Sequence, residues 1–436
     1  MLRIRSFSDS EVEAIGEAVA RILERVGILC QNQELLTALE NAGAIVDREG
    51  ERAYFPRSMV ADYVERIRAK ASQQRGEDIV EFSPPGLPGI GTQVAQLYYD
   101  YDSKQRRRGN KNDFITVIKL GDVLHGQGGV GHGLLLTDVP PMLEPLEAGM
   151  LLAEYAHNPG PPFAWNVRQV DYLVEMGQVL GLEQWFSWGA ICFGHPLRFD
   201  RDVADRFVRR VREGHPTGLT AMPVAGVTAP VTAAGFVAMA AAEHLATWIA
   251  ALALNPDVQL SGSMWAGSID MRTGHVSYSA FDAMLYAFAT VDFIERWCGI
   301  KIPVGGGEYC DAREPGMYAA LEKAYKALLI AAFTGTHPGI GSGMLEEGKT
   351  LCPVQLLLER DLAGGLAHLG RPLIADEETL ALELVEHIGL GFTENYLQAD
   401  HTLAHFRDSC WLPQLIDRSG WAGAQTDEAV LASAQR

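Results

Sequence analysis

Aromatic side chains are the first residues in this sequence whose types and spacing could do chemistry. Five of them fall at or just after the ends of predicted strands: Phe163, Trp165, Phe193, Trp265 and Tyr309. A ring of aromatic faces can bind a cationic nitrogen, and each desolvated contact contributes up to about 2 kcal/mol. Aromatic residues at such positions also close the ends of hydrophobic cores, so a packing role is the alternative for each one.

Residues of the types that bind zinc occur in two short motifs, and both motifs are incomplete. His401-x-x-x-His405 places two imidazoles on one helix face, and Cys192-x-x-His195 lies near the end of a predicted strand. Neither motif has the further carboxylate or thiolate that a zinc site needs at short spacing. We therefore expect no metal site, with zinc as the alternative. The sequence also lacks a G-x-S-x-G motif, so it does not support a covalent mechanism.

Three glycine-rich stretches have different contexts. Residues 126–133 precede a predicted strand, so their amides lack the helix N-terminus that reinforces a phosphate loop, and we expect no nucleotide there. Gly305, Gly306 and Gly307, and later residues 339–343, lie at strand ends. Glycine at such positions permits close packing or lets a flat ligand approach the backbone.

The elements that must position these residues alternate between short apolar runs and longer helical stretches from about Asn112 onward, as βα units do. The predicted strands are residues 134–139, 163–167, 187–193, 218–223, 258–264, 301–306 and 339–344. The predicted helices are residues 144–157, 170–180, 201–214, 232–255, 280–297, 317–334 and 354–369. Residues 373–375 form a weak eighth strand.

The distribution of polar residues favours a closed sheet over an open one. An open doubly wound sheet gathers functional residues at one switch point, whereas here small, polar and aromatic residues follow every predicted strand. We therefore expect an α/β fold, a TIM (β/α)8 barrel with a helical N-terminal extension and a C-terminal helical tail. The expected divisions are residues 1–111 for the N-terminal helical extension and a hairpin, 112–376 for the barrel, and 377–436 for a helical tail packed on the barrel.

The N-terminal region shows two local patterns. Apolar residues recur there with the helical period of 3.6, namely Val12, Ile15, Val19, Ile22, Leu23 and Val26. Further on, a tyrosine-rich run at 98–101 and the arginines at 106–108 are flanked by turn residues and predict a hairpin. The arginines are expected to be a solvated loop, with an anion site or a partner contact as the alternative.

Composition and charge restrict the classes of function. The chain has 436 residues, of which 47% are hydrophobic, so a packed core is feasible. The net charge of −19 opposes phosphate backbones and anionic lipids, so we expect neither a nucleic-acid nor a membrane partner. The apolar stretch 237–254 contains Glu243 and His244 and is predicted to be a buried helix. Six scattered cysteines and a charged N-terminus without a secretion signal favour a cytoplasmic location.

Three groups of short motifs follow one another along the chain. The first comprises ILERVGI at 22–28, LENAGA at 39–44 and YFPRSM at 54–59. The second comprises APVTAAG at 229–235, AEH at 242–244, NP at 255–256 and DMRTG at 270–274. The third comprises GSGML at 341–345, YL at 396–397, HTLAHFR at 401–407, WLP at 411–413 and DR at 417–418. In this order and spacing they resemble the trimethylamine methyltransferase superfamily, in the branch that lacks pyrrolysine and acts on quaternary amines.

This resemblance implies a TIM barrel that transfers a methyl group from a methylated amine to the Co(I) centre of a separate corrinoid protein. The sequence has no D-x-H-x-x-G segment, so we expect no cofactor bound by this chain and cobalamin supplied by the partner. A quaternary ammonium leaves as a neutral amine, so orientation and desolvation suffice for catalysis. The expected substrate is a small cation such as glycine betaine, proline betaine, carnitine or choline.

The expected site residues follow from this interpretation. The predicted cation cage is Trp165, Phe193, Trp265 and Tyr309, with Glu308 as counter-charge. A substrate carboxylate would need donors, for which His337, Arg313 or the Gly305–Gly307 amides are candidates. The same glycines, with His401 and His405 of the tail, are candidates for a surface that faces the corrinoid or closes over the barrel, and core packing is the alternative. The chain also departs from the family: Tyr309-Cys310-Asp311-Ala312-Arg313 stands where relatives have Thr/Ser-Asp-Ser/Ala-Lys.

Other functions stay open at this point. A sulfonium or other methylated compound would need the same cage, and a barrel without catalytic activity could simply bind betaine. A zinc-assisted methyltransferase is a further alternative. We also expect a homo-oligomer, because the apolar helix at 232–255 could pack against a second subunit.

Overall fold

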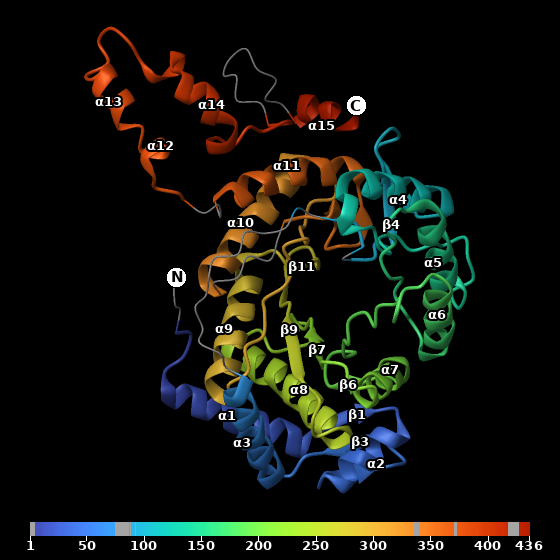
Figure 1. Ribbon diagram of the computed structural model, residues 1–436. Helices are drawn as coiled ribbons and strands as arrows, with labels where there is room; N and C mark the ends of the chain where they lie inside the picture. Colours follow the sequence, from blue (N-terminus) through green and yellow to red (C-terminus); the bar gives the residue numbers. More distant parts are fainter. Residues whose placement is uncertain are drawn as a thin grey trace.

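Helices α4 to α11 follow one another in chain order around short central strands in the computed structural model (Figure 1). The structure describes residues 5–74, 87, 89–91, 93–334, 340–369, 373–416 and 427–436. These helices are α4 (Lys111–His125), α5 (Glu144–Tyr155), α6 (Val167–Val179), α7 (Arg201–Arg212), α8 (Ala233–Leu254), α9 (Phe281–Cys298), α10 (Met317–Thr334) and α11 (Pro353–Leu369). From α5 onward their ends agree with the predicted helices to within three residues, because apolar residues in each helix recur at helical spacing or form a continuous apolar stretch.

The central strands are short, and each one pairs with the next along the chain. β7 (Thr217–Ala221) and β9 (Leu260–Met264) pair in parallel along their whole length. Single parallel bridges pair Ala95 with Leu134, Val130 with Pro159, Phe163 with Ser187 and Met264 with Val304. Backbone hydrogen bonds connect the remaining neighbours, from Thr220 N–H to the Ile191 carbonyl and from Gly341 N–H to the Gly307 carbonyl.

The last strand pair along the chain contacts the first of the central strands. β12 (Met344–Leu345) and β13 (Thr350–Leu351) form a hairpin, and β13 pairs in parallel with β4 (Leu97–Asp100). β4 also forms the predicted hairpin with β5 (Gln105–Arg108). The strand that pairs with β13 therefore precedes α4. The weak strand predicted at 373–375 is wrong: these residues form no strand and Leu373 is 98% exposed, whereas a central parallel strand is buried.

The N-terminal region forms a layer beneath the central strands. Its apolar stripe lies on α1 (Asp9–Arg25), which begins with a capping box between Ser8 and Glu11 and packs on α8 and α9. The other helices of the layer are α2 (Gln33–Asn41) and α3 (Arg57–Gln74). The layer also contains strands that periodicity did not predict, β1 (Ile28–Cys30), β2 (Ile45–Asp47) and β3 (Arg52–Tyr54), in a sheet of order β2-β3-β1-β6 with β6 (Arg198–Phe199).

Helix α8 is the most apolar helix of the described chain, and it is an interior helix. It is long and apolar enough to cross a membrane, but 83% of its apolar window is buried inside the protein. The N-terminal helices α1 and α2 cover it on one side, and α9 and β7 lie against it elsewhere. The prediction of a buried helix is confirmed. Its apolar faces are taken up within the same chain, so α8 gives no reason to expect a second subunit.

The C-terminal region divides into a docked part and an arm. Helix α15 (Asp427–Gln435) packs on α11 through Val430, Leu431 and Ala434. The arm contains α12 (Glu377–Leu380), α13 (Leu382–Ile388), the 3-10 turn η2 (Tyr396–Gln398) and α14 (Asp400–Ser409), and Figure 1 shows it standing away from the ring of helices. Ile388 is the one buried residue in the arm. The proposed boundaries at residues 111 and 376 stay predictions.

Candidate active site

The candidate site lies where several central strands end. Trp265 directly follows β9, and residues 305–309 follow the strand segment at Val304. The turn between β12 and β13 contributes Glu347. The carboxyl ends of parallel strands meet at one side of such a sheet, so residues far apart in the sequence come together there. A small sheet of β8 (Val224–Ala225), β10 (Gly267–Ile269) and β11 (Val276–Ser277) continues the chain at this side.

Three aromatic rings form the centre of the site. The indole of Trp265 and the ring of Tyr309 meet edge to face, with centroids 4.8 Å apart. The ring of Tyr278 lies 5.8 Å from that of Tyr309. Gly348 packs on Tyr309 from the β12–β13 turn, where a Cβ atom would come within 2.1 Å of the ring. Trp265 and Tyr309, two of the four residues of the predicted cage, are therefore in contact, and Tyr278 was not predicted.

Lys326 of α10 reaches into this aromatic group. Its Nζ lies 5.7 Å from the centroid of Tyr309 and donates a hydrogen bond of 2.6 Å to the backbone carbonyl of Tyr278. Gly306 leaves room for it, because a Cβ there would come within 2.6 Å of Nζ. Burial lowers the pKa of Lys326, and the nearby carboxylates of Glu347 and Glu308 oppose that shift. The ammonium is thus a buried charge that is held by few hydrogen bonds.

Glu347 is the most unusual group in the site. Both of its carboxylate oxygens are buried, and neither forms a hydrogen bond of ordinary geometry with a described residue, although the carboxyl of Asp311 and the backbone of Tyr278 lie close to them. Burial raises the pKa of Glu347 well above its ordinary value, and the carboxyl of Asp311 adds to the shift while Lys326 opposes it. The indole N–H of Trp265 is also buried without a partner in the described chain. Buried polar atoms are nearly always hydrogen-bonded, so two unpaired groups around Tyr309 indicate a place for a ligand.

Glu308 adds a second carboxylate beside the lysine. Burial raises the pKa of Glu308, while Lys326 and Lys323 oppose the shift. Two acidic groups, aromatic faces and one ammonium therefore share the same region. Aromatic faces and carboxylates bind a cation, and the ammonium can bind an anion.

Trp165 belongs to a different cluster. Its indole N–H donates to Glu144 at 2.8 Å, and its ring stacks on Phe163 with centroids 5.7 Å apart. The ring of His132 accepts from the Phe163 N–H at Nδ1, so its Nε2–H donates to Glu144 at 2.9 Å. Burial raises the pKa of Glu144, but the hydrogen bonds from His132, Leu136 and Trp165 outweigh burial and leave it below its ordinary value. Glu144 is thus a satisfied carboxylate, unlike Glu347.

Two other predicted site residues, Phe193 and Arg313, have their contacts outside the three aromatic rings. Phe193 is buried and packs on Phe199 with centroids 4.9 Å apart, within the main hydrophobic core. Arg313 is exposed and bonds to Nε2 of His275 at 3.0 Å. His337 lies outside the described residues. The binding roles assigned to these three residues stay predictions.

The tail histidines contact one another within the arm. The rings of His401 and His405 lie 4.5 Å apart on α14, and both bond to Glu378 of α12. These contacts fix the arm's own geometry, and the proposed role of the two histidines in facing the corrinoid stays a prediction. His195 of the second zinc motif donates to Glu243 at 2.8 Å and accepts from the Met222 N–H, so its ring nitrogens are both occupied. No group of three or more possible metal ligands occurs in the described part of the chain.

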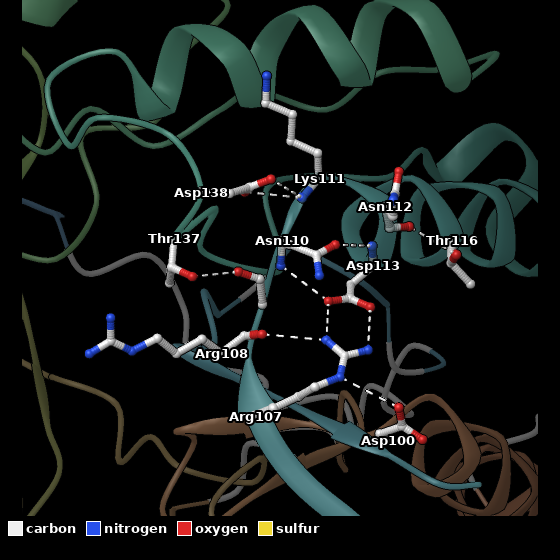
Figure 2. A network of polar contacts seen from close by, with 11 residues as sticks. Asp100, Arg107, Arg108, Asn110, Lys111, Asn112, Asp113, Thr116, Thr137 and Asp138 are labelled. Atoms are coloured by element: carbon white, nitrogen blue, oxygen red, sulfur yellow. Dashed lines mark hydrogen bonds and ion pairs between the residues drawn. The ribbon is translucent and has the colours of Figure 1, made fainter. Parts of the chain in front are cut away.

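The arginines of the β4–β5 hairpin are only partly a solvated loop. Figure 2 shows the guanidinium of Arg107 forming two hydrogen bonds with buried Asp113, at 2.5 and 2.8 Å. Asp113 also completes the capping box of α4 with Asn110. Arg106 pairs with Glu346 and so links the hairpin to the β12–β13 turn next to Glu347. The side chain of Arg108 points away from the network in Figure 2, as expected of a solvated residue.

Sequence reasoning missed Tyr278, Lys326 and Glu347. Glu347 lies in a segment that was identified as following a strand, but the pattern does not distinguish it from its neighbour Glu346. Lys326 interrupts an apolar helix, and a charged residue at an inward position was the available signal. Tyr278 had no signal, because its contribution depends on the small β8-β10-β11 sheet.

A family model and one relative each match most of the chain. The model of the family described as trimethylamine methyltransferase (MTTB) matches residues 2–428. The glycine betaine methyltransferase of Desulfitobacterium hafniense strain Y51 is 23% identical over 435 residues, which cover 95% of this chain and 87% of that protein. The trimethylamine methyltransferase MttB of Methanosarcina barkeri is 27% identical over 241 residues, or 54% of this chain and 47% of that one. The crystal structure of the Methanosarcina barkeri monomethylamine methyltransferase MtmB covers 92% of both chains at 12% identity, with a TM-score of 0.44.

Proposed function

Because the chain belongs to the trimethylamine methyltransferase family, we propose that it removes one methyl group from a quaternary ammonium compound and transfers it to the cobalt of a separate corrinoid protein. Glycine betaine and similar small cations are the proposed methyl donors. The similarity to a glycine betaine methyltransferase over 95% of the chain supports this choice. We place the reaction in the cytoplasm, as the sequence predicts.

We infer that the central strands close into a (β/α)8 barrel. The support is the series of parallel contacts from each strand to the next, together with the return of β13 to β4. In such a barrel the loops after the strands form the active site. The aromatic group around Trp265 and Tyr309 lies in these loops, which is where a substrate would bind.

The proposed methyl transfer requires little acid or base catalysis by the protein. When a nucleophile takes a methyl group from a quaternary nitrogen, the C–N electron pair stays on nitrogen and a neutral tertiary amine leaves. The reduced cobalt of the partner supplies the nucleophile. This chain must strip water from the cation, orient one N–CH3 group and exclude competing nucleophiles.

One observation carries the assignment of the cation site. The carboxylate of Glu347 is buried and unpaired in the described structure, beside a pair of aromatic rings. A buried, unpaired carboxylate is costly unless a cation neutralises it. A quaternary ammonium offers positive charge without hydrogen-bond donors, so it suits an acceptor and aromatic faces together. Glu308 would add a second negative charge.

The proposal is tested by the absorbance change that accompanies methylation of cob(I)alamin. The purified enzyme is mixed with free cob(I)alamin and, in turn, glycine betaine, proline betaine, carnitine, choline, trimethylamine or a sulfonium analogue of betaine. We expect methylation with at least one quaternary amine and none with trimethylamine. Turnover with the sulfonium alone would favour the sulfonium alternative. Calorimetric binding of a betaine without methylation, even with corrinoid proteins present, would indicate a binding protein.

A variant localises the reaction to this site. Glu347→Gln keeps the size of the side chain and removes its charge, so it should weaken binding of the cation. Glu175→Gln on the exposed face of α6 is the matched control, because this glutamate lies outside the site. Equal activity of the two variants would show that the cation binds elsewhere.

A further inference from the structure

Lys326 carries the charge opposite to that of Glu347 within the same site. We infer that Lys326 binds a carboxylate on the substrate, so that the site selects zwitterions over quaternary amines that lack an acid group. The inference rests on the proposed function, and it names a specificity residue that neither sequence patterns nor the comparisons indicate.

The hydrogen bonds of Lys326 leave donors unused. An ammonium has three N–H donors, and Nζ of Lys326 makes one hydrogen bond within the described structure, to the Tyr278 carbonyl at 2.6 Å. No carboxylate of the described residues lies within 4.0 Å of this nitrogen, so the lysine has charged neighbours but no ion-pair partner. The residue is only 3% exposed, which keeps water from replacing the missing partner.

Lys323, one helical turn earlier on α10, shows what a structural lysine looks like here. It is fully buried, forms an ion pair with Glu359 and donates to the carbonyl of Met344. Glu359 in turn accepts from Gln355 at 2.9 Å and from the Gly343 N–H at 2.8 Å. Lys323 is thus paired within a complete network, whereas Lys326 at the same depth is not. A ligand carboxylate would give Lys326 the partner that Glu359 gives Lys323.

The positions of the two charges set the orientation of the ligand. Glu347 attracts a cation and repels a carboxylate, and Lys326 does the opposite. A short zwitterion therefore lies with its ammonium toward Glu347 and its carboxylate toward Lys326. Tyr309 contacts both regions, since its ring meets Trp265 and lies beneath Nζ of Lys326. A quaternary amine with a neutral end would leave Lys326 unpaired.

Two ligands of nearly equal shape separate this role from the cation site. Glycine betaine has a carboxylate, and glycine betaine amide has the same trimethylammonium group and a neutral end. By isothermal titration calorimetry with the full chain, we expect the wild type to bind the betaine at least tenfold more tightly, since charge-assisted hydrogen bonds are worth about ten- to hundredfold in affinity. Lys326→Met should abolish this preference while it retains binding of the amide.

Lys119→Met is the matched control, because Lys119 also lies over a tyrosine ring but on the exposed surface of α4. It should keep the wild-type preference. Equal affinity of the wild type for betaine and amide would overturn the inference, and so would a preference that persists in folded Lys326→Met. If Lys326→Met does not fold, the ratio of the wild-type affinities for the two ligands still tests the inference. Failure of glycine betaine, its amide and the other quaternary amines of the panel to bind would instead contradict the proposed function.

Discussion

The indole of Trp265 lies directly against the backbone of Gly305, so closely that a Cβ atom at residue 305 would come within 1.9 Å of Nε1. The two residues belong to successive strand ends, and the Gly305 N–H donates to the carbonyl of Met264, just before the tryptophan. The glycine therefore sets how deeply the indole can lie. This explains one of the three consecutive glycines that sequence analysis left open between close packing and ligand approach.

Gly305→Ala should displace Trp265 and weaken cation binding. The added methyl group overlaps the indole, and overpacking of this kind costs about 1–3 kcal/mol of folding free energy. Thermal unfolding and calorimetry with glycine betaine would measure both effects. Gly364→Ala on α11 is the control, because the nearest atom to its added Cβ, Nε1 of Trp411, lies 4.0 Å away. Unchanged betaine affinity in Gly305→Ala would show that the position of Trp265 does not matter for binding.

Trp265→Leu tests the aromatic contribution itself. Loss of one desolvated cation–π contact of about 2 kcal/mol weakens binding roughly thirtyfold. We expect this reduction for glycine betaine and for its amide alike, because both carry the trimethylammonium group. Trp165→Leu provides the comparison between the two aromatic clusters. A larger loss of affinity in Trp165→Leu than in Trp265→Leu would move the cation site to the cluster around Glu144.

The helices of this fold could be predicted from the sequence, because a helix depends mainly on the spacing of apolar residues within its own segment. The strand at 97–100 was predicted as part of a hairpin, but its place beside the central strands was not, since its partners Leu134 and Leu351 are far away in the chain. Trp265 and Tyr309 were identified because they directly follow strands. Lys326 approaches the same site from a helix, and Glu347 differs from Glu346 only in the direction of its side chain, which depends on tertiary structure.

Arg107→Met should destabilise the protein, whereas Arg108→Met should not. Arg107 neutralises buried Asp113 with two hydrogen bonds, and its loss leaves a buried carboxylate without its charged partner, which costs about 1–3 kcal/mol. The side chain of Arg108 is exposed, so its replacement is expected to change stability by about 0.5 kcal/mol at most. Urea unfolding followed by circular dichroism compares the two. Equal midpoints would mean that Arg107 contributes no more to stability than the solvated Arg108.

Removing one partner of the Lys323–Glu359 ion pair should lower the free energy of unfolding far more than replacing both partners by uncharged residues. Glu359→Gln leaves a fully buried ammonium without its counter-ion, and such a loss costs about 3–5 kcal/mol. The double variant Lys323→Met, Glu359→Gln removes both charges and should recover part of that stability. The same urea titration measures both. A double variant less stable than the sum of its single changes would contradict the charge-based explanation.

The affinity for glycine betaine should depend on pH in two opposite ways. Burial raises the pKa of Glu347 well above its ordinary value of 4.5, so part of the free protein carries a neutral carboxyl in the weakly acidic range. A bound cation favours the charged form, so affinity should rise as pH increases through this pKa. Burial lowers the pKa of Lys326 below 10.5, and carboxylate binding needs the ammonium, so affinity should fall again in the alkaline range.

Glycine betaine amide separates the two limbs of the pH profile, namely the rise of affinity in the acidic range and its fall in the alkaline range. It needs the negative charge of Glu347 but not the positive charge of Lys326, so its affinity should rise with pH and then stay level. Because the two groups interact, the limbs report the pair rather than isolated residues. Calorimetry across the pH range, in buffers of different ionisation enthalpy, also detects the proton that the cation should displace from Glu347. A falling alkaline limb for the amide as well as the betaine would mean that the lysine acts through the stability of the site and not through the substrate carboxylate.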